Sequence, residues 1–344
     1  VRVIGVPKTL KTPRIIAVEP TCMQYAQQAV SIAIMKLIED DKIIQSFIDF
    51  SAQEPNQLMA RIGSVDGSLA TLDLSEASDR VSNSLVLSLL HGYTDLSEAV
   101  QACRSLQADV PGQGVIPLTK FASMGSALTF PIESMIFLTL VFLGIERRQG
   151  HRLSLTDVKK YIGKVRVYGD DIIVPNTDAV SVVETLEAYG FKVNTRKSHW
   201  KGNFRESCGK EYFRGVDVSV VKCRREFPER RADVQQVISL VALRNLFYLR
   251  GWRRTSEHLD TIIRGILDVY PDGKEDSPGL VRVVDGPVSY ERWDRNRHVG
   301  LVKAYVPRYQ YKKIGLDGYP ALLKFLLKQG EEPFADREHL ERSG

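Results

Sequence analysis

The chain has 344 residues, with 47 Lys or Arg against 42 Asp or Glu and a net charge of +5. This length is enough for two or three lobes around an extended core, and the composition is that of an ordinary globular protein. The mild positive charge is compatible with a polyanionic partner. Four scattered cysteines without a Cys-x-x-Cys pair argue against a disulfide framework or a zinc ribbon and favour a reducing compartment.

Membrane and targeting segments are not visible in the sequence. The longest apolar run, residues 135–145, is shorter than the ~20 residues that cross a bilayer. No signal peptide is recognisable. The chain begins with Val rather than Met and starts in mid-pattern, so we expect a truncated N-terminus.

The first half of the chain alternates extended and helical patterns. Its expected elements are an extended basic segment over residues 1–20, a helix over 22–50, a buried strand over 69–74, a helix over 75–90 and a loop over 104–120. Three prolines exclude a helix from the first segment, since proline lacks a backbone N–H and restricts the residue before it. Apolar residues run up to Asp73, so we expect this carboxylate to emerge where the strand ends.

The second half begins with an apolar helix and a short hairpin. Its expected elements are a helix over residues 130–149, a hairpin centred on Gly169, a helix over 177–189 stopped by Gly190, short strands over 191–193 and 211–221, helices over 232–269, and a tail over 280–344 with short strands and a final helix near 320–328. The sequence contains no internal repeat and no clean linker. We therefore expect lobes that interleave along the chain.

Two adjacent aspartates at the tip of the expected hairpin are the most informative feature. Residues 165–174 read Val-Arg-Val-Tyr-Gly-Asp-Asp-Ile-Ile-Val, with β-forming residues on both sides of a Gly-Asp turn. The carboxylates of Asp170 and Asp171 repel each other unless a cation lies beside them, and hard oxygen ligands of this kind suit Mg²⁺. A solvated Asp-Asp turn is the alternative for this motif alone.

An upstream pair of aspartates is a candidate partner for the hairpin. Residues 71–79 read Thr-Leu-Asp-Leu-Ser-Glu-Ala-Ser-Asp. If the strand that ends at Asp73 lies beside the hairpin, Asp73 and Asp170 face each other in the geometry of two divalent metals that clamp a phosphoryl transfer. Asp79 could reach a ligand sugar instead. The plainer alternative is a helix N-terminus capped by Asp73 or Ser75.

A third motif lies between these two. Residues 124–133 read Met-Gly-Ser-Ala-Leu-Thr-Phe-Pro-Ile-Glu, a Gly/Ser turn leading into a helix with Thr129 and Glu133 on one face. The turn at Gly125 can let backbone approach a nucleotide or a template closely. A plain loop before a core helix is the alternative.

The order of the three motifs carries the functional argument. Asp-x5-Asp after a strand, Gly-x3-Thr-x3-Glu and Tyr-Gly-Asp-Asp resemble motifs A, B and C of the palm of RNA-dependent RNA polymerases. Residues 6–20 look like motif F, a basic finger. Residues 69–79, 130–137 and 204–217 are similar to the replicase catalytic (beta) subunit of single-stranded RNA bacteriophages, the levivirus group. The resemblance runs from residue 1 to roughly 228, and the family's longer N-terminal part is expected to be missing.

The resemblance implies an α+β right-hand polymerase fold, with an antiparallel palm sheet, partial fingers and a helical thumb in a single interleaved catalytic unit. The implied segments are partial fingers with the motif F loop at 1–68, palm with motif A at 69–100, a fingers insertion at 101–120, palm with motifs B to E at 121–228, and thumb with the C-terminal tail at 229–344. Residues 208–213 match motif E, a strand turn that supports the primer end.

The same resemblance assigns roles to individual residues. Asp73 and Asp170 would hold two Mg²⁺ ions, for which Mn²⁺ could substitute, with Asp171 assisting. Asp79 would read the ribose 2′-OH, and Lys197 matches the motif D lysine expected to act as general acid toward the leaving pyrophosphate. The remaining nucleotide contacts are implied for Lys8, Lys11 and Arg14 at the triphosphate, and for Gly125 and Thr129 along the template and nascent pair.

One departure from the wider polymerase pattern concerns Glu133, where many positive-strand polymerases carry Asn. An ionised Glu cannot donate a hydrogen bond. Our hypothesis is that Glu133 accepts a hydrogen bond from the 2′-OH or from Thr129. This requires a basic neighbour or a raised pKa, because Asp79 should be close. Taken alone, Lys197 and the other cations are more simply explained as solvated surface residues.

The C-terminal third adds basic and aromatic candidates. Its helices could present arginines to a duplex product, or as a solvated face, at Arg244, Arg250, Arg253, Arg254 and Arg264. Tail aromatics could stack on a template or initiating nucleotide, although core packing is the plainer role for Tyr305, Tyr309, Tyr311 and Tyr319. A zinc site from His199, Cys208 and Cys223 has poor spacing.

The resemblance therefore implies two-metal nucleotidyl transfer: RNA synthesis from NTPs on an RNA template, replicating a phage genome in the cytoplasm of the bacterial host. The implied partners are template and product RNA, host translation elongation factors Tu and Ts and a ribosomal protein, without a membrane. A reverse transcriptase is the nearest rival, but such enzymes place a bulky aromatic where this chain has Ala77, Ser78 and Asp79. The other rival is a catalytically inactive RNA-binding palm protein, against which the intact aspartates argue.

Overall fold

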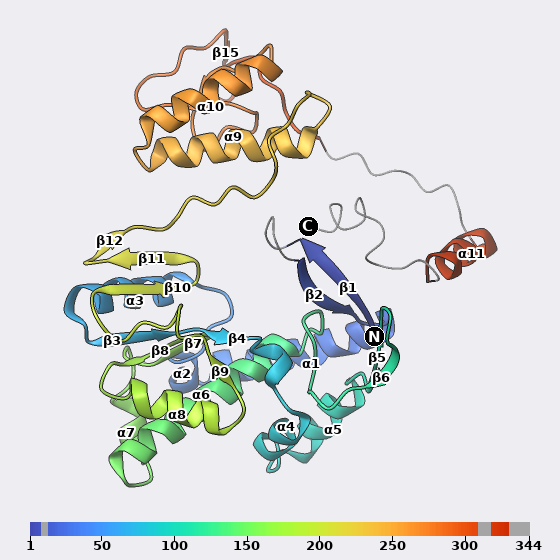
Figure 1. The fold of residues 1–344 in the computed structure, drawn as a ribbon, viewed down its shortest axis with the longest axis vertical. Coiled ribbons are helices and arrows are strands. Elements are labelled where there is room, and N and C mark those ends of the chain that lie inside the picture. Colours follow the sequence, from blue (N-terminus) through green and yellow to red (C-terminus); the bar gives the residue numbers. More distant parts are fainter. Residues whose placement is uncertain (8–12, 309–317, 330–344) are drawn as a thin grey trace. The chain divides into compact units, whose positions relative to one another are not determined.

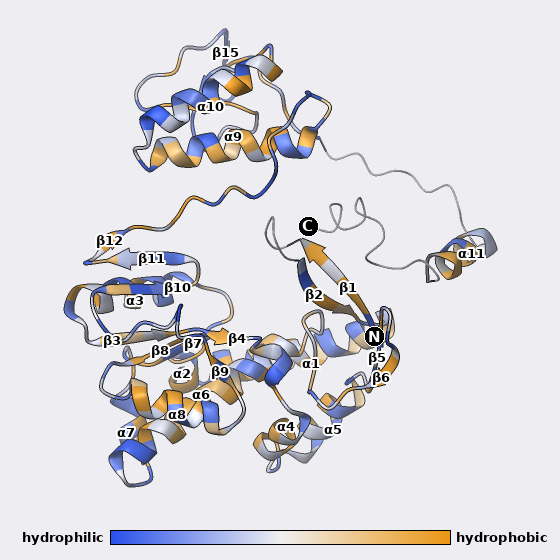
Figure 2. Ribbon diagram, viewed as in Figure 1, coloured by the Kyte–Doolittle hydropathy of each residue, from blue (hydrophilic) through white to orange (hydrophobic). Residues whose placement is uncertain are grey.

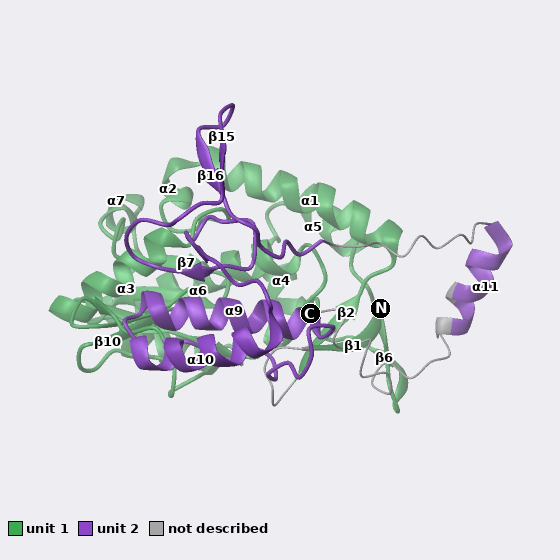
Figure 3. Ribbon diagram, turned by 90° about the horizontal axis from the view of Figure 1, so that it is seen from above, with its two compact units in different colours: residues 1–6, 13–219, 332–344 green, residues 7–12, 220–331 purple. Residues whose placement is uncertain are grey.

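The computed structural model describes residues 1–7, 13–308 and 318–329 (Figure 1). They divide into two compact units, coloured separately in Figure 3. The first, which we call the N-terminal unit, comprises Val1–Val6 and Pro13–Ser219. The C-terminal unit consists chiefly of the described residues from Val220 onward. Four residues with predicted roles lie outside the described residues: the tail aromatics Tyr309 and Tyr311, and the triphosphate-contact candidates Lys8 and Lys11.

A three-stranded antiparallel sheet lies at the centre of the N-terminal unit, in the order β3-β8-β7. Its strands are β3 (Leu69–Leu72), β7 (Arg166–Tyr168) and β8 (Asp171–Pro175). All four residues of β3 are buried, as expected for an apolar run without alternation. Leu72 pairs with Ile172 and Tyr168 pairs with Asp171, so the predicted hairpin around Gly169 is confirmed.

The strand predicted over residues 69–74 is interrupted at one position. Asp73 separates β3 from β4 (Leu74–Ser75), which pairs with β9 (Lys192–Val193) in a second small sheet. The backbone therefore changes partners at Asp73. This change directs the aspartate out of the ladder at the end of β3.

Two helices pack against each other beside this sheet and contribute to its core. They are α6 (Thr129–Gln149) and α8 (Ala179–Ala188), which form part of the core alongside other helices and the strands of the sheet. A β-carbon on Gly144 would lie 2.7 Å from the Cα of Val182, so glycine permits the close approach of the two helices. Hydrophobic residues gather in these helices and strands in Figure 2, and the buried core includes Leu72, Ile136, Phe137, Val141, Ile172 and Leu186.

Helix α6 is longer than the apolar run seen in the sequence. It is the one helix among the described residues that is long and apolar enough to cross a membrane. However, 56% of its most apolar stretch is buried inside the protein. Its last turn carries Arg147 and Arg148, and the helix ends at Gly150 in the left-handed conformation. These features are those of a core helix.

A second sheet contradicts the loop predicted over residues 104–120. Its order is β2-β1-β5-β6, formed by β1 (Arg2–Pro7), β2 (Pro13–Val18), β5 (Gln107–Val110) and β6 (Gly114–Pro117). Gly112 and Gly114 adopt positive φ angles of 76° and 72°. The glycines that suggested a loop close a tight turn, which lets β5 and β6 pair as a hairpin.

The helix predicted over residues 75–90 is also wrong in its first half. The segment contains β4, a 3₁₀ helix η1 (Ser78–Arg80) and then α4 (Asn83–Leu89). Glu76 has a φ of 54°, which no α-helix accommodates. The helix begins only where the Ser82 hydroxyl accepts a hydrogen bond from the backbone N–H of Leu85.

The described part of the N-terminal unit also contains five further α-helices and a third antiparallel sheet. The helices are α1 (Thr21–Asp40), α2 (Lys42–Gln45), α3 (Glu54–Asp66), α5 (Thr94–Ala102) and α7 (Leu155–Lys159). An antiparallel sheet is formed by β10 (Phe204–Ser207), β11 (Lys210–Phe213) and β12 (Val216–Asp217). Fully buried Arg205 donates from Nε to the carbonyl oxygen of Leu69 at 2.5 Å, which joins β10 to β3.

The C-terminal unit contains two packed helices with short strands and a final helix. Its elements are α9 (Val234–Leu249), α10 (Arg253–Ile266), β13 (Asp272–Gly273), β14 (Arg282–Val283), β15 (Arg292–Asp294), β16 (Val299–Leu301) and α11 (Gly318–Gln329). The helical pattern predicted over residues 232–269 is therefore confirmed as two helices. Gly251, with a φ of 79°, lies between them.

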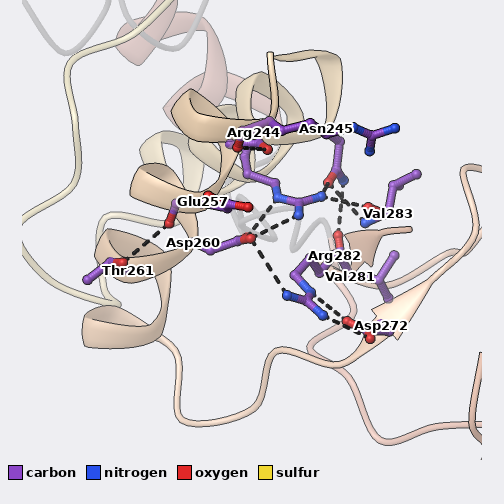
Figure 4. A network of polar contacts seen from close by, with 11 residues as sticks. Arg244, Asn245, Glu257, Asp260, Thr261, Asp272, Val281, Arg282 and Val283 are labelled. Carbon is purple, nitrogen blue, oxygen red and sulfur yellow. Dashed lines mark hydrogen bonds and ion pairs between the residues drawn. The ribbon is translucent and has the colours of Figure 1, made fainter. Parts of the chain in front are cut away.

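One arginine of the predicted basic face is instead a core residue of this unit. The side chain of Arg244 is buried and donates to both carboxylate oxygens of Asp260, at 2.7 and 2.9 Å (Figure 4). It also donates to the carbonyl oxygen of Val283 at 2.7 Å. Arg244 is therefore part of the core of this unit and not of an exposed basic face. Arg253, Arg254 and Arg264 are exposed.

Candidate active site

The tip of the hairpin rests on helix α6. Gly169 has a φ of 59°, and a β-carbon there would lie 2.7 Å from Cε2 of Phe130. Its backbone N–H donates to the hydroxyl of Ser134 at 3.2 Å. The rings of Phe130 and Tyr168 pack edge to face, with centroids 5.1 Å apart. These contacts fix the position from which Asp170 and Asp171 project.

The register of the central sheet brings the upstream aspartate to the hairpin. Because Leu72 pairs with Ile172 in an antiparallel ladder, Asp73 follows β3 at the end where Asp171 begins β8. Burial raises the pKa of Asp171 to about 6, and the nearby charges of Asp170 and Asp73 add to this rise. The Ser207 hydroxyl donates to Oδ1 of Asp171 at 3.4 Å.

The loop after β9 surrounds the carboxylate of Asp73. Asn194 donates from Nδ2 to Oδ2 of Asp73 at 2.9 Å. Nζ of Lys197 lies 3.8 Å from Oδ1 of the same residue. The backbone N–H of Asp73 donates to the Ser198 hydroxyl at 3.0 Å. Lys197 therefore lies beside the aspartates with which the sequence grouped it, and Asp73 caps no helix.

Glu133 lies beneath the hairpin with only 7% of its surface exposed. Burial raises its pKa to about 8, and the charge of Asp170 contributes to this rise. The hypothesis required a basic neighbour or a raised pKa, and the pKa of Glu133 is raised, although the acidic neighbour is Asp170 rather than Asp79. The proposed hydrogen bond from Thr129 to Glu133 is wrong, because the Thr129 hydroxyl donates to the carbonyl oxygen of Ser123 at 3.0 Å.

The Gly/Ser turn before α6 packs against another strand. Gly125 has a φ of 121°, and a β-carbon there would lie 2.0 Å from the carbonyl oxygen of Ala17. The backbone N–H of Ala17 donates to the carbonyl oxygen of Met124 at 2.7 Å. The turn is thereby joined to β2, the strand on which exposed Arg14 lies. The glycine is needed for this backbone contact.

Asp79 has a partner that the sequence motifs did not reveal. Nζ of Lys120 lies 2.5 Å from Oδ1 of Asp79, although the residues are 41 positions apart. Nearly half of the Asp79 side chain, 48%, is exposed. A lone lysine after a Gly/Pro-rich segment carries no recognisable signal, so only the fold could identify the pair.

The chemistry of the aspartates fits a hard divalent cation. Asp73, Asp170 and Asp171 offer carboxylate oxygens only, and their mutual repulsion contributes to the raised pKa of Asp171. Within residues 1–7, 13–308 and 318–329, no group of three or more His, Cys, Asp or Glu side chains is placed to hold a metal ion. Mg²⁺ is usually bound through one or two carboxylates and completes its shell with water and substrate phosphates.

A solved structure of an RNA-dependent RNA polymerase with vp4 and double-stranded RNA resembles this fold. It superposes with a TM-score of 0.53 over 77% of this chain and 26% of that chain, at 12% sequence identity. The chain thus has the α+β fold of right-hand polymerases.

Curated relatives agree with this assignment. The RNA-directed RNA polymerase beta chain of Enterobacteria phage fr is 34% identical over 309 residues, which is 90% of this chain and 46% of the relative. That of Escherichia phage MS2 is 38% identical over 250 residues, or 73% of this chain and 41% of the relative. The chain therefore spans less than half the length of these relatives. The family model for the RNA replicase beta-chain matches residues 1–327. This chain belongs to the RNA replicase beta-chain family.

Proposed function

We propose that this chain catalyses template-directed RNA synthesis from NTPs on an RNA template, and so replicates a positive-strand RNA phage genome. The observation that carries the proposal is the meeting of Asp73 with the Asp170-Asp171 hairpin at one end of the central sheet. Membership of a family whose relatives are named RNA-directed RNA polymerases supports it.

The aspartates form the proposed reaction centre. Asp73 and Asp170, assisted by Asp171, would hold two Mg²⁺ ions, with Mn²⁺ as a substitute. Bound there, the metal would lower the pKa of the attacking 3′-OH and neutralise the charge on the phosphates. Lys197, whose Nζ lies 3.8 Å from Oδ1 of Asp73, is the proposed general acid toward the leaving pyrophosphate.

The proposed nucleotide contacts come from the flanking motifs. Asp79 accepts a hydrogen bond from the ribose 2′-OH. Glu133 accepts a hydrogen bond from the ribose 2′-OH, which is the form of our hypothesis that remains after Thr129 is found bonded to Ser123. The other proposed contacts are those of Lys8, Lys11 and Arg14 with the triphosphate, and of Gly125 and Thr129 with the template and nascent pair.

The proposed partners follow from family resemblance alone. They are template and product RNA, translation elongation factors Tu and Ts, and a ribosomal protein, encountered in the cytoplasm of the bacterial host. Pull-down of the purified chain with each purified factor tests this list, and absence of binding to a factor removes that factor from it.

The experiment for the proposed activity tests whether the template base determines which nucleotide is added. A short RNA hairpin with one defined unpaired template base is given each NTP and each dNTP separately with Mg²⁺. We expect only the complementary nucleotide to be added, and the NTP in preference to the dNTP. Extension with dNTPs would move the assignment to a reverse transcriptase. RNA binding without extension, after addition of the proposed factors, would identify a binding protein.

A further inference from the structure

We propose that Lys120 is a specificity-determining residue for ribose selection, acting by holding Asp79 in the position that reads the 2′-OH. The inference rests on the proposed polymerase function and adds to it a residue outside the three motifs. It is carried by the ion pair between Lys120 and Asp79 and by the way the backbone of Lys120 is anchored.

The ion pair uses one oxygen of the Asp79 carboxylate and leaves the other available to a ligand. Nζ of Lys120 donates to Oδ1 of Asp79 at 2.5 Å. Oδ2 of Asp79 has no hydrogen bond from any residue that the structure describes. The Asp79 side chain is 48% exposed, so a ligand hydroxyl can reach this second oxygen. A carboxylate held at one oxygen presents the other in a fixed direction.

Among the cations that the structure describes, Lys120 is the one that forms an ion pair with Asp79. Arg80 is adjacent to Asp79 in sequence, but its Nη2 donates to Oε2 of Glu76 at 3.1 Å. Arg80 also points Nη1 toward the carbonyl oxygen of Gly190, at 3.5 Å. The charge opposite Asp79 therefore comes from a distant segment of the chain.

The segment that carries Lys120 is held in place by Arg104. This guanidinium donates to three carbonyl oxygens of the segment: those of Leu118 at 2.6 Å, Lys120 at 2.8 Å and Phe121 at 3.0 Å. Three bonds from one planar group restrain a segment whose β-structure is a bridge between Lys120 and Ser82.

The opposite side of the segment is tied to the region around Asp79. The backbone N–H of Phe121 donates to the carbonyl oxygen of Val81 at 2.7 Å. The backbone N–H of Asn83 donates to the carbonyl oxygen of Thr119 at 3.2 Å. Lys120 thus projects from a backbone fixed on both sides, and its 27% exposed side chain is directed to Asp79.

This arrangement accounts for discrimination by a simple difference between substrates. A ribonucleotide donates its 2′-OH to the oriented oxygen of Asp79. A deoxyribonucleotide lacks this donor and leaves the carboxylate without its partner, which is the kind of loss that gives strong rejection. Removal of Lys120 frees the carboxylate to rotate and weakens the preference.

The test compares kcat/KM for NTP and dNTP incorporation opposite the same template base. In Lys120→Met, which keeps the aliphatic stem, we expect the NTP-to-dNTP ratio to fall by about tenfold or more. Lys120→Gln should give the same fall, and Lys120→Arg should retain most of the ratio because it keeps the charge. In an Asp79→Asn background, Lys120→Met should change the ratio no further.

Lys160→Met is the matched control, since Nζ of Lys160 lies 2.8 Å from Oδ1 of Asp157 in an ion pair at the end of α7. Its ratio should equal that of the wild-type chain. An unchanged ratio in Lys120→Met and Lys120→Gln, or an equal loss with both substrates, would overturn the inference while the polymerase assignment stands. A wild-type chain that adds no nucleotide would contradict the proposed function and this inference together.

Discussion

At the residue scale, glycines determine how the candidate site is assembled. Gly169 leaves room for the ring of Phe130 beneath the hairpin, and Gly125 leaves room for the carbonyl oxygen of Ala17. Both have positive φ angles. The sequence identified these glycines as turn residues, but not which atoms occupy the space beside them, because those atoms come from distant segments.

Gly125→Ala should destabilise the N-terminal unit strongly. The added methyl group would overlap the backbone of Ala17 in a conformation that L-residues rarely adopt, and we expect a loss of about 2 kcal/mol or more. Gly150→Ala is the control, since Gly150 also has a positive φ but a β-carbon added there would meet nothing within 4 Å. Urea unfolding measures both, and equal losses would contradict the backbone contact.

Glu133 should make the stability of the metal-free chain depend on pH. Its folded pKa is raised from 4.5 to about 8, so the folded state binds its proton more tightly than the unfolded state between these values. Stability therefore falls as pH rises from about 4.5 to 8, by an amount on the order of 2 to 4 kcal/mol.

Glu133→Gln should remove this part of the pH dependence. Urea unfolding in EDTA at pH 5 and pH 8.5 gives the free energy of unfolding of the wild-type chain and of the variant. Subtracting one protein from the other cancels the titration of the groups that both share. Identical pH slopes in the two proteins would show that Glu133 is not held uncharged by its surroundings.

At the scale of elements, the spacing of apolar residues and the positions of turn residues predicted the structures that depend on neighbours in sequence. The hairpin around Gly169 and the helix α6 follow from β-forming residues and from a continuous apolar pattern. The β5–β6 hairpin was missed because its strands have only four residues each and lie in a segment that contains Pro111, Gly112, Gly114 and Pro117. The helix predicted over residues 75–90 failed at its start, because Ser75 belongs to the β4–β9 pairing and Glu76 after it has a positive φ.

The α9–α10 pair supplies a prediction about a buried charge. Arg244→Met should cost about 3 to 5 kcal/mol, because it leaves the carboxylate of Asp260 buried with only Arg282, whose Nη1 lies 3.8 Å away. The double variant Arg244→Met, Asp260→Leu should recover much of this loss. Unfolding of the full chain, followed in urea, measures each step.

Arg253→Met provides the control for that comparison. Arg253 also pairs with an aspartate, Asp285, at 2.7 Å, but both side chains are largely exposed. Its removal should leave stability nearly unchanged. A loss in Arg244→Met no larger than that in Arg253→Met would contradict the role of Arg244 as a buried structural residue.

At the scale of the whole molecule, the order of motifs along the chain identified the family before any geometry. Three short segments with Asp73, Gly125 and Asp170 in the expected order sufficed, because each motif combines chemistry with a turn or strand end. The Lys120–Asp79 pair and the burial of Arg244 lay beyond sequence reasoning. Both depend on contacts between segments far apart in the chain, for which no local pattern exists.

The Mg²⁺ dependence of nucleotide addition in the wild-type chain and in Asp170→Asn tests the proposed reaction centre most directly. We expect NTP addition that requires Mg²⁺ and falls by about 100-fold or more in the variant. Asp157→Asn, which changes an aspartate of the α7 capping box, should keep the wild-type rate. Addition by Asp170→Asn at the wild-type rate would contradict the placement of the reaction centre at the hairpin.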